Sequence, residues 1–265
     1  MIQDSMSRPS SSMSAPDRLL DLRAWCKQPL GQQLTVAEQD LLREVLGDVF
    51  GYHLVQLDPS CQADSLAASR IMHRVVQSCT QHGLEQAPGL LGRAEALPLQ
   101  SDSIDAFVLS HVLELAHDAH QVLREIDRCL VADGHLIVLG FNPYGWWGLR
   151  KAIFGWRGSV PWSLRFVSLP RLKDWLSLLG FDTIQTRYFF PYPPWQYGSL
   201  GNREGTTLLQ RLHRDHWPLL AASYLLVARK RVTTLTPIKP RWRPRRSVLA
   251  GGVVGTSQGS VRPHG

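Results

Sequence analysis

The chain has 265 residues, of which 44% are hydrophobic and 19% charged, and its formal net charge is +7. This length suffices for one large domain or two small ones, and the composition excludes a wholly disordered or fibrous chain. No stretch approaches the roughly eighteen consecutive apolar residues that a membrane-spanning helix needs, which excludes such a span.

Most of the positive charge is confined to one segment late in the chain. Residues 229–246 hold eight basic side chains and no acidic one, whereas the rest of the chain is close to neutral. We therefore assign the basicity to a largely disordered tail, residues 233–265, rather than to the folded body. Such a tail is suited to RNA phosphates or an anionic membrane, although a solvated terminus is the commoner meaning of this composition.

The four cysteines, Cys26, Cys61, Cys79 and Cys129, are widely spaced, with no CxxC pair and no histidine cluster. This pattern predicts reduced thiols in a cytoplasmic protein and argues against a metal site. Residues 1–16 are polar and lack helical periodicity, so we predict that they are disordered. They also lack the apolar segment of a signal peptide, so we expect that the protein is not secreted.

Two helices form the expected N-terminal preface, residues 17–50. The segment from Asp17 to Gly31 has the pattern of a short amphipathic helix that ends at its proline and glycine. Thr35 and Glu38 follow in capping-box spacing, in which each side chain satisfies a free amide of the first helical turn. We therefore expect a second helix to begin at this point.

From residue 51 to 232 the pattern changes to β-rich runs separated by helical stretches. The predicted strands are 52–58, 71–78, 89–94, 105–110, 135–142, 181–190 and 223–231, and the predicted helices are 117–131 and 169–180. This alternation indicates an α/β fold with a Rossmann-like, doubly wound sheet. Because the last two strands follow a single helix and a long insertion, we expect a mostly parallel sheet with an antiparallel last strand.

The segment from residue 95 to 143 carries the most specific pattern. An EALP start and a polar turn lead into a buried strand that ends in SHVLEL, and LREIDRCLVADGHLIVLG then supplies a helix, a turn and a further strand. This arrangement resembles the central part of the class I S-adenosylmethionine (SAM)-dependent methyltransferases, in particular the type 11 group. The likeness extends over about residues 50–230. AWCKQPLGQQL with the following Glu38, and the ending SYLLVARKRVTTLTPIKPRWR, are similar to an uncharacterised bacterial subgroup.

The resemblance implies that SAM binds at the carboxyl ends of the strands. A glycine-rich loop, an acid that bonds the ribose hydroxyls, and residues around the adenine are expected after the first three strands. Here residues 58–63 contain no glycine, residues 77–79 contain no carboxylate, and Arg93 reverses the charge of a usual acid. An alternative register makes residues 52–60 the second strand and Asp58 the ribose acid.

In the favoured register, the resemblance places six residues around the cofactor, with Arg93 turned away from the adenine. His111 follows the fourth strand and is the candidate catalytic residue, because an imidazole of ordinary pKa accepts a proton from a hydroxyl or amine. Its alternative role is packing at the start of a helix, and Glu114 and Asp118 are expected on a helix surface or at a helix start. The expected cofactor residues are Asp58, Ser60, Glu95, Ala96, Leu97 and Ser110.

Two aromatic-rich insertions, residues 144–166 and 188–216, are expected to cover the cleft as lids. The first combines four tryptophans with basic residues, a mixture suited to a membrane surface or to a lid packed on the domain, and we favour the lid. Residues 142–144, Asn-Pro-Tyr, have the pattern of a turn that can border a pocket.

Three functions remain open from the sequence. The resemblance implies a SAM-dependent methyltransferase that acts on an unidentified small-molecule acceptor. The glycine-free segment after the first strand favours instead a catalytically inactive protein of the same fold that serves as an interaction module. The hypothesis of an RNA methyltransferase is supported by the basic tail alone, and the near-neutral charge of the rest of the chain argues against it.

The domain boundaries lead to a direct test. If residues 233–265 form a tail without a core, truncation after Val232 leaves the melting temperature and any ligand affinity unchanged. Differential scanning calorimetry of the full and truncated chains makes the comparison. A large loss of stability would show that the tail docks on the domain.

Overall fold

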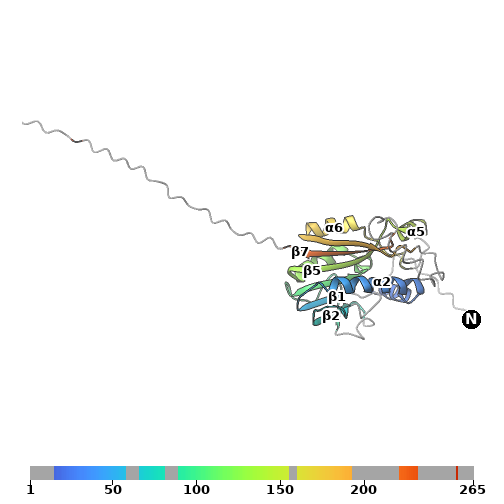
Figure 1. Ribbon diagram of the computed structural model, residues 1–265, viewed down its shortest axis with the longest axis horizontal. Helices are drawn as coiled ribbons and strands as arrows, with labels where there is room; N and C mark the ends of the chain where they lie inside the picture. Colours follow the sequence, from blue (N-terminus) through green and yellow to red (C-terminus); the bar gives the residue numbers. More distant parts are fainter. Residues whose placement is uncertain are drawn as a thin grey trace, which may run out of the picture. The chain divides into compact units, whose positions relative to one another are not determined.

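A computed structural model of the chain describes residues 15–57, 66–80, 89–154, 160–192, 221–231 and Gly255 (Figure 1). The predicted positions Asp58 and Ser60, most of the lid at 188–216 and all of the tail except Gly255 lie outside these residues.

Within the described residues, seven strands form one sheet in the order β3-β2-β1-β4-β5-β7-β6. All neighbouring strands run parallel except where β7 pairs with β5 and with β6, so the mostly parallel sheet with an antiparallel last strand is confirmed. The strands are β1 (His53–Leu57), β2 (His73–Ser78), β3 (Gly89–Leu91), β4 (Ile104–Ser110), β5 (Leu130–Phe141), β6 (Phe181–Phe189) and β7 (Ser223–Lys230).

The pairing of β1 decides between the two registers. Residues 53–57 lie between β2 and β4 and pair with both, which makes this segment the first strand of the sheet. The favoured register is therefore correct. The alternative, in which residues 52–60 form the second strand and Asp58 ends it, is wrong.

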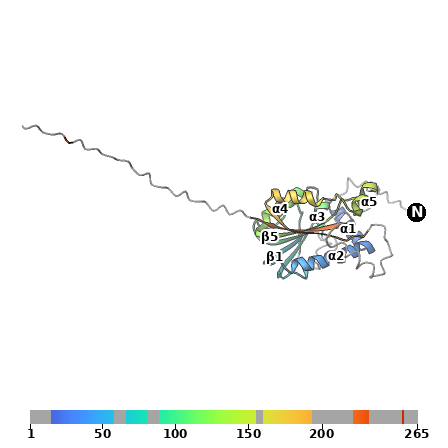
Figure 2. The ribbon, with the colours of Figure 1, turned by 45° about the horizontal axis from the view of Figure 1, so that its top comes forward.

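Helices cover both faces of the sheet, and Figure 2 shows α4 and α2 on opposite sides of it. Alternate residues of each strand point to opposite faces, so β4 sends Phe107 and Leu109 toward α4 but Ala106 and Val108 toward α2. The helices are α1 (Ala15–Cys26), α2 (Pro29–Leu46), α3 (Val112–Leu115), α4 (Ala119–Cys129), α5 (Trp146–Phe154) and α6 (Leu169–Leu178).

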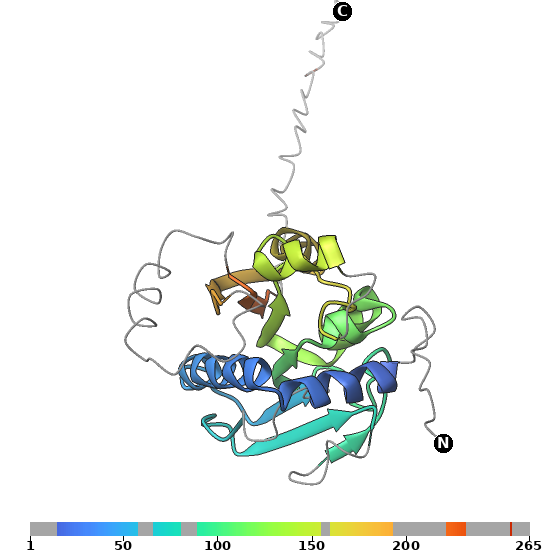
Figure 3. The same ribbon diagram turned by 90° about the vertical axis from the view of Figure 1, so that its right-hand side faces the viewer.

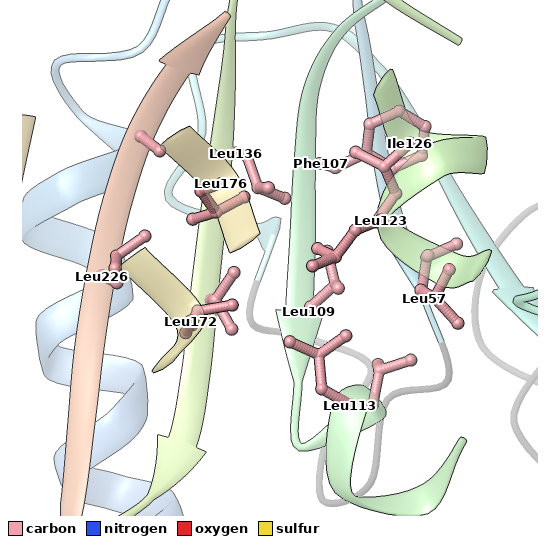
Figure 4. Close-up of a cluster of buried hydrophobic side chains, with 14 of the residues drawn as sticks. Leu57, Phe107, Leu109, Leu113, Leu123, Ile126, Leu136, Leu172, Leu176 and Leu226 are labelled. Carbon is pink, nitrogen blue, oxygen red and sulfur yellow. The ribbon is translucent and has the colours of Figure 1, made fainter. Parts of the chain in front are cut away.

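The larger core lies between the sheet and the helices α3, α4 and α6. Leu123 and Ile126 of α4 keep helical spacing and meet the strand residues, and Leu172 and Leu176 of α6 do the same (Figure 4). Asp118 begins α4 by accepting hydrogen bonds from the amides of His120 and Gln121 at 2.9 and 3.1 Å, as predicted for a residue at a helix start.

The start of α2 differs from the prediction. The helix begins at Pro29, whose fixed φ and missing amide suit a first helical position, and it runs through Thr35 and Glu38 without a break. The capping box expected at these two residues is therefore wrong. Both side chains are buried in the middle of the helix, which leaves the Glu38 carboxylate available for a distant partner.

A short connection, residues 27–28, joins α1 to α2, and Figure 3 draws these two helices in blue, one following the other. Gly31 makes the close approach of the two helices possible, because a Cβ at this position would lie 2.5 Å from the carbonyl oxygen of Trp25 and 2.6 Å from Cα of Cys26. Trp25 in turn meets Trp147 of α5 edge to face at 5.6 Å between ring centroids and Trp162 at 6.4 Å. The first insertion thus packs its buried tryptophans against α1.

Three of the eight basic residues in the segment 229–246 belong to the folded domain, in agreement with the predicted strand 223–231. Arg229 and Lys230 end β7, and Arg231 follows directly. Arg231 contacts Asp182 at 2.6 Å, and Lys230 donates hydrogen bonds to the carbonyl oxygens of Asp127 and Leu130. The local charge at this end of the sheet is therefore partly balanced.

Packing of α6 against the sheet gives a stability prediction. Leu172→Ala removes a fully buried side chain and should lower the free energy of unfolding by about 2–5 kcal/mol. Leu178→Ala, on the same helix but 80% exposed, is the matched control and should change it by less than about 0.5 kcal/mol. Urea unfolding measures both, and equal effects would show that α6 does not pack as described.

Candidate functional site

A cavity of about 690 Å³ opens at the carboxyl edge of the sheet. Because β2, β3 and β4 are parallel, the segments that follow them meet at this edge, and the first turns of α1 complete the wall. The described lining residues are Pro16, Arg18, Leu19, Cys79, Leu91, Gly92, Arg93, Ala94, Glu95, Val112, Leu115, Ala116 and His117.

Glu95 supplies the only carboxylate among these described lining residues. One of its oxygens accepts a hydrogen bond from the amide of His117 at 3.2 Å, and the other lies 3.6 Å from Nε of Arg93. Arg93 also lines the cavity, although its side chain is 76% exposed. The side chains after β3 thus bring one negative and one positive group to the same wall.

The other predicted cofactor residues near Glu95 stand away from the described wall. Ala96 is exposed, and Leu97 is buried with its amide donating to Glu125 at 3.0 Å. Ser110 is buried at the end of β4. The structure therefore brings Glu95 to the cavity but not these three residues.

The end of β2, where the resemblance predicts an acid, is contacted instead by an arginine from α1. Arg23 of α1 donates hydrogen bonds to the hydroxyls of Thr80 at 3.0 Å and Ser78 at 3.3 Å. These two residues flank Cys79, which lines the cavity. Sequence reasoning missed this contact, because the arginine lies far away in the chain and on a helix treated as a preface.

Arg18, one turn and a half before Arg23 on α1, is a second basic group that sequence reasoning missed. Its side chain lines the cavity, and its Nε is buried without a hydrogen-bond partner among the described residues. A buried donor without a partner is costly and uncommon, so this atom marks a place where a ligand can add an acceptor.

His111 is fully buried and lies behind the described cavity wall rather than on it. Its Nε2 donates to the Glu38 carboxylate of α2 at 2.7 Å, and its Nδ1 lies 3.9 Å from Glu114. Its ring stacks on Phe141 with 3.9 Å between centroids. Burial by itself lowers the pKa of His111, but the Glu38 and Glu114 carboxylates outweigh it and raise the pKa to about 10.

Glu114 lies in the first turn of α3 and is buried, so of its two expected positions the helix start is correct and the helix surface is not. Its carboxylate accepts a hydrogen bond from the amide of Phe141 at 2.8 Å. Gly140 makes room for it, because a Cβ there would lie 2.9 Å from the Glu114 carboxylate and 2.5 Å from the hydroxyl of Tyr224. Two carboxylates and one imidazolium are thus enclosed between α2, α3 and β5.

A smaller cavity of about 210 Å³ lies after β5. Asn142 and Tyr144 form the predicted turn, in which the amide of Tyr144 donates to the Asn142 side chain at 3.1 Å. The described lining residues are Pro143, Tyr144, Arg165, Phe166, Val167, Ser168, Arg171 and Trp175.

The described part of the chain contains no group of three or more His, Cys, Asp or Glu residues placed to hold a metal ion. Within the same residues, no helix is both long and apolar enough to cross a membrane. Neither Cys79 nor Cys129 forms a disulfide, whereas Cys26 is bonded in one, so the prediction of reduced thiols is wrong for Cys26.

Comparisons with known proteins agree with this geometry. The sequence profile described as "Methyltransferase domain" matches residues 39–138. The Escherichia coli (strain K12) protein named "Uncharacterized protein YafS" is 32% identical over 238 residues, which cover 88% of this chain and 89% of the relative. The chain belongs to the class I SAM-dependent methyltransferases, type 11 group.

Solved structures support the same fold for this methyltransferase-family chain. A SAM-dependent methyltransferase from Thermotoga maritima has a TM-score of 0.54 at 19% identity, covering 72% of this chain and 87% of its own. A SAM-dependent methyltransferase from Archaeoglobus fulgidus also has a TM-score of 0.54, at 13% identity, covering 74% of this chain and 94% of its own.

The buried cluster around His111 predicts a pH dependence. The fold raises the pKa of His111 from 6.5 to about 10, so protonated His111 stabilises the folded state. This stabilisation is complete below pH 6.5 and is lost as the pH rises through 10. Because each pKa unit corresponds to about 1.4 kcal/mol, the loss should amount to several kcal/mol. Urea unfolding at closely spaced pH values measures it.

Glu38→Gln should flatten this dependence, because it removes the charge that raises the pKa of His111 most strongly. Glu44→Gln is the control on the same helix, since Glu44 pairs with Arg187 at a more exposed position. If the native protein keeps a constant free energy of unfolding from pH 6 to 10, the ionised cluster is not present in solution.

Proposed function

We propose that the protein is a SAM-dependent methyltransferase that transfers a methyl group to a small-molecule acceptor, with the 690 Å³ cavity as its cofactor site. The observation that carries this proposal is the position of the cavity in the sheet. The strand order reverses between β1 and β4, and in open α/β sheets ligands bind at the carboxyl edge beside such a reversal.

The described walls fit the adenosine end of SAM. Leu19, Leu91 and Val112 supply apolar surface of the kind that encloses a flat purine ring, and the cavity volume lies in the usual range for small-ligand sites. Glu95 is the carboxylate that would accept hydrogen bonds from the ribose hydroxyls, in place of the acid absent from the end of β2.

When bound, SAM supplies an electrophilic methyl group on a positively charged sulfur. The chain contributes binding and positioning, which suffice for many methyl transfers because an aligned acceptor needs no further activation. We propose that α1 closes one wall of the cavity against water. Its tryptophan contacts to Trp147 and Trp162 and its hydrogen bonds from Arg23 to Ser78 and Thr80 hold it there.

We propose that His111 is a positioning residue. With a pKa of about 10 the buried imidazole already holds its proton at neutral pH, so it fixes α2 and α3 rather than taking a proton from an acceptor. Leu115 and Ala116, just beyond it in the chain, line the cavity. The His111 contacts thereby set the position of part of the wall.

We place the acceptor at the smaller cavity after β5. It opens beyond the end of a strand parallel to β4, at the same edge of the sheet as the larger cavity. Tyr144, Phe166 and Trp175 give it an aromatic lining suited to an organic molecule.

An inactive protein of this fold is the second candidate function. The observation that favours it is the end of β2, where Arg23 contacts Ser78 and Thr80 and no carboxylate is present in residues 77–80. A binding measurement separates the two candidates, because the inactive form predicts no affinity for SAM or for its product S-adenosylhomocysteine.

Isothermal titration calorimetry with SAM and S-adenosylhomocysteine tests the proposal. We expect micromolar binding, about −8 kcal/mol. Ala116→Trp should fill the cavity and weaken binding at least about tenfold, whereas Ala119→Trp, half-buried at the start of α4 and away from the described wall, should not.

The melting temperature of each variant shows whether it is folded, and Ala116→Leu replaces the tryptophan variant if that one is not. Absence of heat with both ligands at millimolar concentration would reject the methyltransferase proposal and favour the inactive protein. Binding that Ala116→Trp and Ala116→Leu leave unchanged would place the cofactor elsewhere.

A further inference from the structure

Among the described residues, the larger cavity is bordered by more positive than negative charge. Arg18 and Arg93 line it, and Arg23 lies at the residues that flank Cys79 in its wall. Glu95 is the single carboxylate among the described lining residues. Because SAM is itself a cation, this balance of charge favours an anionic ligand over SAM when both fit the cavity equally well.

The place of Arg23 in the fold points to a specific anion. In α/β nucleotide-binding sheets, an acid at the end of the second strand bonds the ribose hydroxyls, whereas an arginine nearby accommodates a phosphate on that ribose. Here residues 77–80 contain no acid, and the Arg23 guanidinium is fixed there by the hydroxyls of Ser78 and Thr80. Arginine is suited to phosphate because its planar fork matches two phosphate oxygens.

A second observation comes from groups left without partners beside the cavity. Nε of Arg18 is a buried donor with no hydrogen-bond partner among the described residues. Gln77 is almost fully buried, and its amide nitrogen donates to the carbonyl of Arg93 at 3.2 Å while its oxygen has no described partner. A phosphate supplies the acceptor that Arg18 lacks, and an adenine amino group is a donor of the kind that the Gln77 oxygen lacks.

We propose that this cavity binds a phosphorylated adenine nucleotide in preference to SAM. The apolar wall takes the base, and Arg18 and Arg23 take the phosphate. The proposal uses the same cavity as the proposed function but does not require methyl transfer, so the nucleotide acts either as a competitor of SAM or as the natural ligand of the site.

Calorimetric titration of the full chain with a matched series of ligands tests this inference. The series is adenosine, AMP, adenosine 2′,5′-bisphosphate, adenosine 3′,5′-bisphosphate, SAM and S-adenosylhomocysteine. We expect at least one of the phosphorylated members to bind at least about tenfold more tightly than adenosine and than SAM. Raised salt should weaken the binding of that member and leave adenosine unaffected.

Arg23→Met and Arg18→Met should each reduce the ratio of the affinity for the phosphorylated ligand to the affinity for adenosine about tenfold, and this ratio cancels any change in the part of the site that the two ligands share. Arg43→Met is the control, because Arg43 lies on the exposed side of α2 and pairs with Asp40. The salt dependence of the native protein tests the same point if either cavity variant fails to fold.

The outcomes separate the two proposals. Equal affinity for adenosine and all its phosphates, tighter binding of SAM than of every phosphate, or no binding of any nucleotide would each overturn the phosphate inference. Binding of SAM or S-adenosylhomocysteine decides the methyltransferase proposal independently. A phosphate preference that persists in both arginine variants would show that other groups hold the anion and would also overturn the assignment.

Discussion

The buried pair of Glu38 and His111 is the contact on which the rest of the site depends. Both side chains are almost completely buried, and 2.7 Å separates the carboxylate oxygen from Nε2. Removing one member of such a pair commonly costs about 3–5 kcal/mol, because the remaining charge stays buried without its partner. Glu114 completes the cluster and binds the amide of Phe141, so one charged group joins α2, α3 and β5.

This cluster makes the N-terminal helices part of the domain. Glu38 fixes α2 to the end of β4, and Gly31 allows the start of α2 to lie directly against the end of α1. With α1 held in this way, Arg18 and Leu19 form part of the cavity wall and Arg23 reaches the end of β2. The cavity is therefore built by the sheet together with a segment that lies before its first strand.

The sheet was predictable because its signals are local or nearly so. Buried runs such as residues 105–110 and 135–142, the Asp118 helix start, and the helix-strand alternation each indicate one structure without distant information. The start of α2 was not predictable in this way, because Glu38 satisfies capping-box spacing while its actual partner, His111, lies 73 residues away.

The site was less predictable than the sheet for the same physical reason. Glu95 was expected at the cavity because it follows a recognisable strand and turn, and it lines the wall. Arg18 and Arg23 were not expected at the cavity, since only the tertiary arrangement of α1 brings them to the ends of β2 and β3. His111 has an ordinary appearance in the sequence, and its high pKa arises entirely from two carboxylates that folding places around it.

A crystal structure of the full chain with S-adenosylhomocysteine or adenosine 3′,5′-bisphosphate tests most directly whether α1 is part of the ligand site. We expect the adenine to lie against Leu19 and Val112, with α1 in contact with the ligand and Glu38 bonded to His111. A ligand bound elsewhere on the sheet, or bound at the same edge without any contact to α1, would contradict this arrangement of the site.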